Sequence, residues 1–140
     1  MLKSVLEHCG YKVGLVGTIQ NMIGDEILPS KNTTPSPYEL QSMFSLMEKA
    51  GCTYCIMEVS SHALDQDRTY GIDFEVGMFT NLTQDHLDYH ITMDNYLKAK
   101  KRFFDELPKG AFAIVNVDDK NGMVMLQNTK AAKKRYSLRS

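Results

Sequence analysis

Four apolar runs alternate with amphipathic segments along this chain. Strands that alternate with helices in this way are typical of α/β domains, because each passage between strands is long enough to hold a crossover helix. The pattern therefore predicts an α/β domain with a mostly parallel sheet. The apolar runs cover residues 11–19, 54–59, 74–82 and 111–117.

The clearest helix is predicted to begin after Ser36. The letters S-P-Y-E supply a capping serine, a proline at the first helical position and Glu39 at the position that completes a capping box. Gly51 stands where a helix-ending glycine belongs. Between these ends, apolar residues recur at the i, i+3, i+4, i+7 spacing of a buried helix face, and they are Leu40, Met43, Phe44 and Met47.

Three further elements are predicted in the second half of the chain. A helix covers residues 94–107 and ends before Pro108 and Gly110, and a weaker helix covers residues 121–130. The last residues, 133–140, form either an edge strand or a tail. With 140 residues the chain has the size of one ordinary domain, and we expect a single globular unit.

Charge and composition narrow the class of partner. The 16 basic and 17 acidic residues give a formal net charge of -1 without a long run of one sign, so neither nucleic acid nor a membrane surface is an expected partner. No apolar stretch approaches the ~20 residues of a membrane span, and the N-terminus lacks the apolar core of a signal peptide. We expect a cytoplasmic protein that acts on small molecules.

The three cysteines, Cys9, Cys52 and Cys55, do not read as a disulfide framework. Cys52 and Cys55 form a lone C-x-x-C motif, which could indicate zinc or redox chemistry. A zinc site needs two more ligands at suitable spacing, however, and Cys55 begins the run CIMEV, which we expect to be a buried strand. A structural role is therefore the preferred interpretation.

Polar residues follow three of the apolar runs directly. CIMEV passes into Ser60, GMFTNL into the segment that contains His86, and AIVNV into Asp118. The carboxyl ends of parallel strands line one edge of a sheet, and ligands bind in the crevice there. Glu58 lies within its apolar run, where a carboxylate is costly unless it meets a cation or hydrogen-bond donors. A metal would be such a partner, and contact with water at the strand end is the alternative.

The segment DHLDYH, residues 85–90, places two carboxylates and two imidazoles in six positions. This oxygen-rich mixture suits magnesium better than a structural zinc. It also lacks the H-E-x-x-H pattern of zinc proteases. A solvated loop or a helix cap is the alternative interpretation.

Lys100 stands on the apolar side of the helix predicted over residues 94–107. On a wheel of roughly 100° per residue that starts at Tyr96, the apolar residues lie from about 300° through zero to about 100°, and Lys100 lies at about 40°. Burial would lower its pKa and increase the neutral amine, which is the form that reacts with electrophiles. A side chain that reaches water at the rim is the alternative. The apolar residues of this face are Leu97, Ala99, Phe103, Phe104 and Leu107.

In this order, the segments resemble the Mur ligases, the ATP-dependent amide-bond ligases of bacterial cell-wall synthesis, and most closely their tripeptide synthetases. The resemblance implies a three-layer central domain of the P-loop type over residues 1–140. Its motifs span nearly the whole chain, and they are GLVGTI (14–19), NTTP (32–35), EVSSHALDQDR (58–68), FTNLTQDHLDYH (79–90), YLKAK (96–100) and VNVDD (115–119).

The resemblance implies a reaction of peptidoglycan biosynthesis, and with it a part in cell shape and cell division. ATP phosphorylates the carboxylate of UDP-N-acetylmuramoyl-L-alanyl-D-glutamate, and the amine of meso-diaminopimelate or L-lysine attacks the acyl phosphate. Magnesium offsets the charge on the phosphates and the intermediate. The implied metal ligands and catalytic residues are Glu58, His86 and Lys100, the last of these as a carbamate formed with carbon dioxide.

The same motifs imply contacts to both substrates. The implied contacts to the UDP-muramoyl substrate are Thr33, Thr34, Ser60, Gln66 and Arg68, and those near the nucleotide are Asn81 and Asn116. The P-loop pattern G-x-x-x-x-G-K-[ST] occurs nowhere, and MLKSVLEHCG resembles the helix that follows this loop. We therefore expect a partial domain that lacks its first strand, its P-loop and the neighbouring ligase domains, and that has no turnover alone.

Two other functions stay open at the level of sequence. The first is a non-catalytic module that binds the muramoyl nucleotide. The second is a ligase similar to folylpolyglutamate synthetase, which shares the plan of the central domain, although NTTP together with DHLDYH argues against it.

Overall fold

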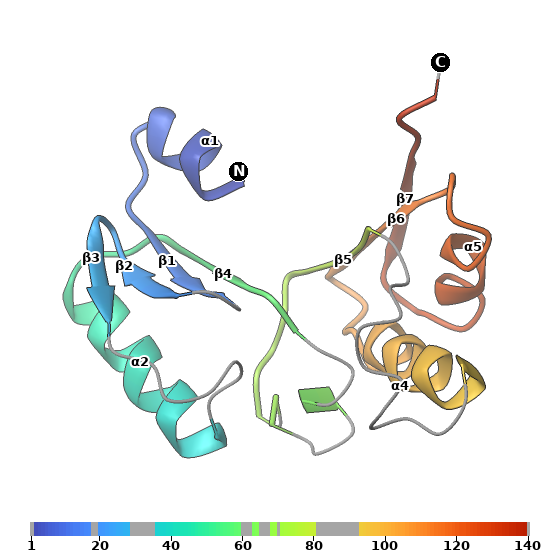
Figure 1. Ribbon diagram of the computed structural model, residues 1–140, viewed down its shortest axis with the longest axis horizontal. Helices are drawn as coiled ribbons and strands as arrows, with labels where there is room; N and C mark the ends of the chain where they lie inside the picture. Colours follow the sequence, from blue (N-terminus) through green and yellow to red (C-terminus); the bar gives the residue numbers. More distant parts are fainter. Residues whose placement is uncertain are drawn as a thin grey trace. The chain divides into compact units, whose positions relative to one another are not determined.

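The computed structural model divides the chain into two compact units, residues Met1–Ala63 and Leu64–Ser140. Figure 1 shows the elements of each unit. The expectation of one domain over residues 1–140 stays a prediction. The structure describes residues 2–17, 20–28, 36–59, 63–64, 68–69, 71–80 and 93–139.

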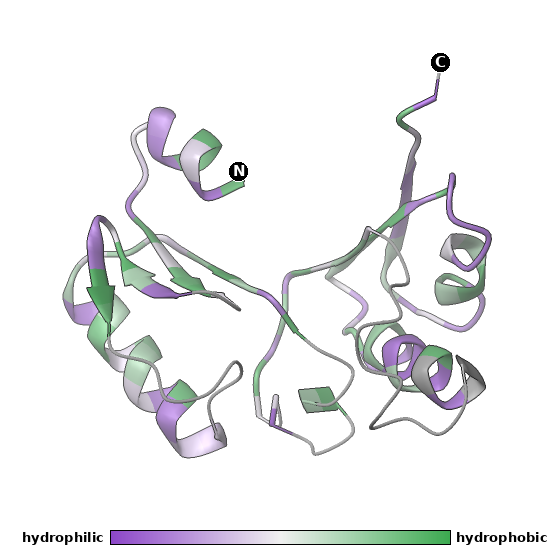
Figure 2. Cartoon of the chain, in the orientation of Figure 1, coloured by the Kyte–Doolittle hydropathy of each residue, from purple (hydrophilic) through white to green (hydrophobic). Residues whose placement is uncertain are grey.

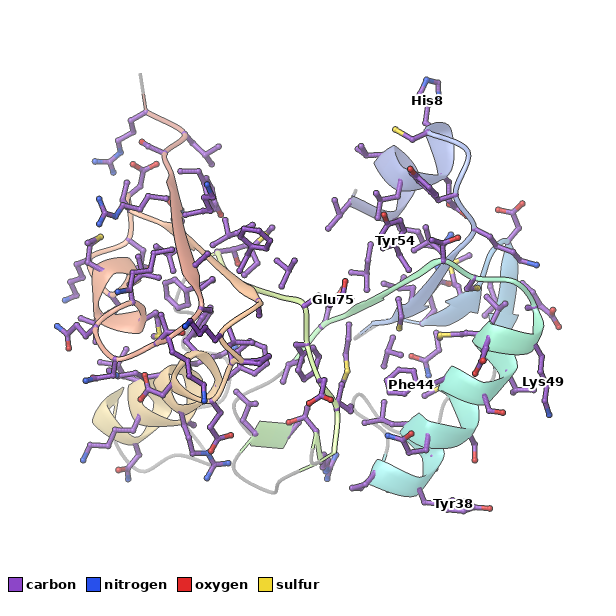
Figure 3. The ribbon with its side chains drawn as sticks, turned by 180° about the vertical axis from the view of Figure 1, so that it is seen from behind. His8, Tyr38, Phe44, Lys49, Tyr54 and Glu75 are labelled. Carbon is purple, nitrogen blue, oxygen red and sulfur yellow. The ribbon has the colours of Figure 1, made fainter. Side chains whose placement is uncertain are left out.

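The first unit is built on a four-stranded sheet. Its elements are α1 (Leu2–His8), β1 (Val13–Val16), β2 (Asn21–Ile23), β3 (Glu26–Leu28), α2 (Pro37–Lys49) and β4 (Tyr54–Met57). The strand order is β3-β2-β1-β4, in which β1 pairs parallel with β4 and the two other pairings are antiparallel. The helices α1 and α2 lie on opposite sides of these strands (Figures 1 and 3).

Helix α2 confirms the prediction made from its capping residues. The Ser36 side-chain oxygen accepts a hydrogen bond from the Glu39 backbone N–H at 3.3 Å, and Pro37 is the first helical residue. Gly51, with φ of 85°, follows the last turn in the left-handed conformation of a helix-ending glycine. On the predicted core face Leu40 and Met47 are buried and the two others, one of them the Phe44 labelled in Figure 3, are half-buried.

The hairpin of β2 and β3 was not expected from the sequence. Its strands are only three residues long, too short for a periodic pattern to stand out, and they are joined by Gly24 and Asp25. Gly24 has φ of 58°, which such a tight turn requires and which glycine adopts without strain. A Gly-Asp pair between two short apolar segments is a recognised hairpin signal, so this element was readable in principle.

The second unit is a three-stranded, fully parallel sheet with two helices. Its elements are β5 (Val76–Phe79), α4 (Met93–Asp105), β6 (Phe112–Asn116), α5 (Gly122–Met125) and β7 (Ala132–Tyr136). The strand order is β5-β6-β7. The α/β class with a parallel sheet is thus confirmed, and residues 133–136, from the segment left open as an edge strand or a tail, belong to β7.

The core of the second unit lies between this sheet and its helices. Ala113 and Val115 point to the same side of β6 and are fully buried with side chains of α4 and α5. Each large apolar side chain buried in this way contributes about 1.5–3 kcal/mol. Figure 2 shows the corresponding division of α4 into a hydrophobic and a hydrophilic side. The buried cluster consists of Phe79, Phe104, Leu107, Ala111, Ala113, Val115, Met125, Leu126 and Ala131.

Two sequence expectations are corrected. Helix α5 covers only Gly122–Met125 rather than residues 121–130. Cys55 is exposed rather than the beginning of a buried strand, because β4 pairs with β1 on one side and has no second partner strand among the described residues. No helix in the described part of the chain is both long enough and apolar enough to span a bilayer.

Candidate functional site

Apart from Arg68, the candidate site residues that the structure describes lie at the carboxyl ends of strands or on α4. Glu58 follows β4 in the first unit. In the second unit Thr80 follows β5 and Asn116 ends β6. This is the edge at which ligands of parallel sheets bind, so the expectation drawn from the order of motifs holds within each unit.

Glu58 is held at the end of the β1–β4 ladder. Its backbone N–H donates to the Val16 carbonyl at 2.8 Å, which continues the parallel pairing one step beyond β4. Its carboxylate lies beside Gly17, where an added Cβ atom would stand 3.5 Å from Glu58 Oε1 and 2.9 Å from the Gln20 carbonyl oxygen. The absence of a side chain at Gly17 therefore leaves room for the carboxylate at this edge.

A buried asparagine supports the turn beside Glu58. Asn21 is only 1% exposed, and its Oδ1 atom accepts a hydrogen bond from the Gly17 N–H at 3.3 Å, while the same N–H reaches the Gln20 carbonyl at 3.1 Å. A buried amide needs such a partner, because leaving it unsatisfied costs about 1–3 kcal/mol. Asn21 was not predicted from the sequence, although a polar residue directly before the apolar pair Met22 and Ile23 is a signal that could have indicated it.

Lys100 occupies the position that the helical wheel predicted. It is half-buried on α4 next to the buried Ala99, whereas Lys98 of the same helix is exposed. Burial lowers the pKa of Lys100 below its usual value of 10.5, as expected for an ammonium group that loses water. A larger share of neutral, nucleophilic amine is the chemical consequence.

Asn116 connects two strand ends through its side chain. Its Nδ2 group donates to the Thr80 carbonyl at 2.9 Å, and its Oδ1 atom accepts from the Asp118 backbone N–H at 2.9 Å. The side-chain amide thus bridges the end of β5 and the loop that follows β6. Part of its hydrogen-bonding capacity is committed to the protein itself.

Asp118 fastens the C-terminal residues to the same strand end. Its carboxylate accepts hydrogen bonds from the Ser137 hydroxyl at 2.5 Å and from the Leu138 N–H at 2.8 Å. These bonds stabilise the charged form and hold the pKa of Asp118 below its usual value of 3.8, the Ser137 hydroxyl contributing most. The loop after β6 and the chain after β7 are thereby joined.

Of the other site residues expected from the sequence, only Arg68 lies in the described part of the chain. Arg68 is half-buried in the second unit. Within the described residues, no three His, Cys, Asp or Glu side chains gather as a metal site would require. The predicted residues that lie outside the described ranges are Thr33, Thr34, Ser60, Gln66, Asn81 and His86.

A separate cavity of about 480 Å³ lies within the second unit, against the C-terminal half of α4. Its size falls in the range of small-molecule pockets. Both apolar and charged side chains line it, and among the predicted site residues that the structure describes, none is part of this lining. The lining residues are Leu64, Thr69, Gly71, Ile72, Asp73, Phe74, Arg102, Phe103, Glu106, Leu107 and Pro108.

Comparison with known sequences gives a match over the whole chain. The family profile of the Mur ligase middle domain matches residues 1–140. The chain is 56% identical over 140 residues to the UDP-N-acetylmuramoyl-L-alanyl-D-glutamate--2,6-diaminopimelate ligase of Parabacteroides distasonis and 54% identical to that of Bacteroides fragilis. The matches cover 100% of this chain and 29% of each relative, so the chain spans less than a third of their length.

Solved structures agree with this match. A structure of a UDP-N-acetylmuramoyl-L-alanyl-D-glutamate--2,6-diaminopimelate ligase aligns with a TM-score of 0.86 and 31% identity, covering 98% of this chain and 28% of that one. E. coli FolC in complex with DHPP and ADP aligns with a TM-score of 0.66 and 22% identity, covering 96% of this chain and 38% of that one. The second likeness shows a shared fold alone.

Proposed function

Because this chain belongs to the Mur ligase family, we propose that it is the middle domain of an ATP-dependent ligase that joins 2,6-diaminopimelate to UDP-N-acetylmuramoyl-L-alanyl-D-glutamate. The observation that carries the proposal is the match, over the whole of this chain, to relatives named for this reaction, at 56% and 54% identity. Those names favour diaminopimelate over lysine as the incoming amino acid. The reaction is proposed for a complete ligase in which this chain is one part, and turnover by the chain alone is not expected.

The proposed reaction forms one amide bond at the expense of one ATP. The terminal phosphoryl group of ATP passes to the glutamate carboxylate of the nucleotide substrate, which leaves ADP. The amine of diaminopimelate attacks the resulting acyl phosphate, loses a proton, and expels inorganic phosphate. Charge accumulates on the phosphoryl oxygens and on the tetrahedral intermediate, so positively charged partners aimed at these atoms are the main requirement.

Magnesium is the metal that the resemblance to this family implies, and the Glu58 carboxylate is a donor of the kind that magnesium prefers. When bound, magnesium neutralises charge on phosphate and carboxylate oxygens. The carboxylate of Glu58 is a hard oxygen donor at the ligand edge of the sheet, beside a glycine that leaves it accessible. We assign Glu58, His86 and Lys100 as the residues that would hold the metal.

Lys100 suits this role only after a change of charge. Its lowered pKa leaves neutral amine, and attack of that amine on carbon dioxide, with loss of one proton, gives a carbamate anion. A carbamate is an oxygen donor of the kind that magnesium prefers, whereas an ammonium group would repel the metal. Burial of Lys100 on α4 supports this assignment.

The remaining residues are assigned to substrate binding. We assign Asn81 and Asn116 to the binding of the nucleotide. The contacts to the UDP-muramoyl substrate are assigned to Thr33, Thr34, Ser60, Gln66 and Arg68. We also propose a cytoplasmic location, supported by the three free cysteines, because disulfides are rare in a reducing compartment.

A chimera tests the proposal. The 140-residue stretch of the Parabacteroides distasonis ligase that this chain matches would be replaced by this chain, and phosphate release would be measured. We expect release that requires ATP, the muramoyl dipeptide nucleotide and diaminopimelate together. A chimera that folds and binds ATP but releases phosphate with none of these combinations contradicts the proposal, and release that requires a folate instead would support the folate-ligase alternative.

Two substitutions in the chimera test the assigned residues. Lys100→Met and Glu58→Gln should each lower the rate about a hundredfold or more, the scale seen when a group that stabilises transition-state charge is removed. Lys98→Met is the matched control for Lys100, because Lys98 is on the same helix but exposed. Equal losses from both lysine substitutions would refute the assignment of Lys100.

A further inference from the structure

The side chain of Asn116 takes the place of a backbone pairing at the end of the second sheet. The ladder between β5 and β6 ends at the pair Phe79 and Val115. One residue further on, the Asn116 Nδ2 group donates to the Thr80 carbonyl at 2.9 Å. The two chains are therefore still joined where the strands stop pairing, but by a side chain rather than by the backbone.

The backbone of Asn116 is fixed from the other side. It pairs with Tyr136 in the β6–β7 ladder, and the next residue, Val117, donates to the Tyr136 carbonyl at 2.9 Å. Gly122 approaches so closely that a Cβ atom added there would stand 2.2 Å from the Asn116 carbonyl oxygen. Little room is left for Asn116 to shift, so the direction of its amide is set by the fold.

The second half of the amide is also engaged. Asn116 Oδ1 accepts from the Asp118 N–H at 2.9 Å. This bond orients the amide, because the oxygen toward Asp118 leaves the NH₂ group toward Thr80. An aspartate of the same shape could still accept from the Asp118 N–H but could not donate to the Thr80 carbonyl.

The bonded carbonyl belongs to the residue that precedes the proposed ligands. Thr80 is followed directly by Asn81, and His86 comes five positions later along the chain. Further along the chain, α4 is anchored in the core through Phe104. The bond at Thr80 therefore holds the end of β5, from which the chain continues to Asn81.

We propose that Asn116 is a positioning residue, which holds the Thr80 carbonyl and thereby sets the exit of the chain that carries Asn81 and His86. This inference rests on the proposed function for the identity of the ligands. It sharpens the assignment of Asn116 to the nucleotide side, since its part is to orient the neighbouring segment through Thr80 rather than to contact the base.

The test uses the 140-residue chain with three variants. Asn116→Asp keeps the acceptor for Asp118 and loses the donor to Thr80, and Asn116→Ala loses both without adding charge. Asn128→Asp is the matched control, because its Oδ1 accepts from Lys101 Nζ at 2.7 Å and an aspartate keeps that acceptor while adding the same charge. The readouts are the amide NMR shifts of residues 81–92, Mn²⁺ affinity by paramagnetic broadening, and thermal unfolding.

We expect Asn116→Asp and Asn116→Ala to move the amide signals of residues 81–92 and to weaken Mn²⁺ binding about tenfold or more, the usual loss when a supporting hydrogen bond is removed. Asn128→Asp should change neither. A new carboxylate near a cation would by itself strengthen binding, so weaker binding by Asn116→Asp points to position rather than charge.

Three results decide the matter. Variants that melt earlier but keep the wild-type signals of residues 81–92 and the wild-type Mn²⁺ affinity would show a merely structural role and overturn the inference. Tighter Mn²⁺ binding by Asn116→Asp would overturn it as well. If the wild-type chain binds no Mn²⁺ while the signals of residues 81–92 still move, positioning stands and the proposed metal site fails.

Discussion

The two units pack a helix against their sheet in the same way, but they differ in how easily they would accept a larger side chain at the point of contact. In each, a strand glycine lets a helix approach the sheet closely. A Cβ atom added at Gly14 of β1 would stand 2.3 Å from the sulfur of Met47 on α2. One added at Gly77 of β5 would stand 2.8 Å from a ring carbon of Phe103 on α4 and 2.9 Å from Leu107, which follows α4. The first neighbour is a flexible thioether, and the second group is a set of packed side chains.

This difference matters for the site. Met47 can change its rotamer to make room. In the second unit, by contrast, Phe103 contacts two rings edge to face, Phe104 with ring centroids 5.3 Å apart and Phe74 with ring centroids 5.1 Å apart. The second unit therefore holds α4, and with it Lys100, in a narrow range of positions. The first unit can adapt around its strands more easily.

The largest expected effect is that of Gly122→Ala in the second unit. Its Cβ atom would stand 2.2 Å from the Asn116 carbonyl oxygen, and backbone cannot move aside as a side chain can. We expect a loss of about 3 kcal/mol or more in the free energy of unfolding, measured by chemical denaturation. Gly110→Ala is the control, because a Cβ atom there meets nothing within 4 Å. A loss no larger than that of the control would remove the claim that this strand end is rigid.

The next effect compares the two strand glycines directly. Gly77→Ala should cost about 2 kcal/mol, because aromatic rings and Leu107 must shift in a packed core. Gly14→Ala should cost about 1 kcal/mol or less, because Met47 can reorient and because alanine restricts the unfolded chain. Parallel denaturation curves measure both. A larger cost at Gly14 than at Gly77 would break the comparison between an adaptable and a rigid unit.

The smallest effect is confined to the C-terminal fastening of the second unit. The pKa of Asp118 is lowered in the folded chain, first by the Ser137 hydroxyl, so its bonds contribute above the usual value of 3.8 and are lost as the pH falls through the lowered pKa. We expect the amide signals of Ser137 and Leu138 to follow this acid titration by NMR, and Asp118→Asn to abolish it. Asp119→Asn, which alters a neighbouring carboxylate, should leave the titration in place. A titration unchanged in Asp118→Asn would show that another group causes it.

Local patterns predicted most of the elements that surround the candidate site. The cap at Ser36, the apolar face of α2 and the half-buried position of Lys100 on the apolar side of α4 all follow from residues within a few positions of one another, and the structure agrees with each. Such features depend on helix geometry alone, so a single sequence can reveal them. The β2–β3 hairpin was missed because three-residue strands carry almost no periodic signal.

Non-local partners could not be predicted. Nothing near Asn21 in the sequence says that its buried amide would hold the Gly17 turn, and nothing near Asn116 says that its amide would reach Thr80, 36 positions earlier. The exposure of Cys55 likewise depends on β4 having its one described neighbour in β1. Hydrogen bonds of this kind depend on which strands become neighbours.

By itself, the sequence determined the α/β class, the capped helix and the ligase motifs, because these are written in short-range spacing and in residue identity. Only the tertiary structure decided that the Asn116 side chain bonds to Thr80 at the end of β5 and that Asp118 bonds to the residues after β7. It also decided that the two units differ in how easily they would accept a larger side chain at the strand glycine. The physical reason is that a side chain's partner and its freedom to move are set by the residues that folding brings beside it, and these come from distant parts of the chain.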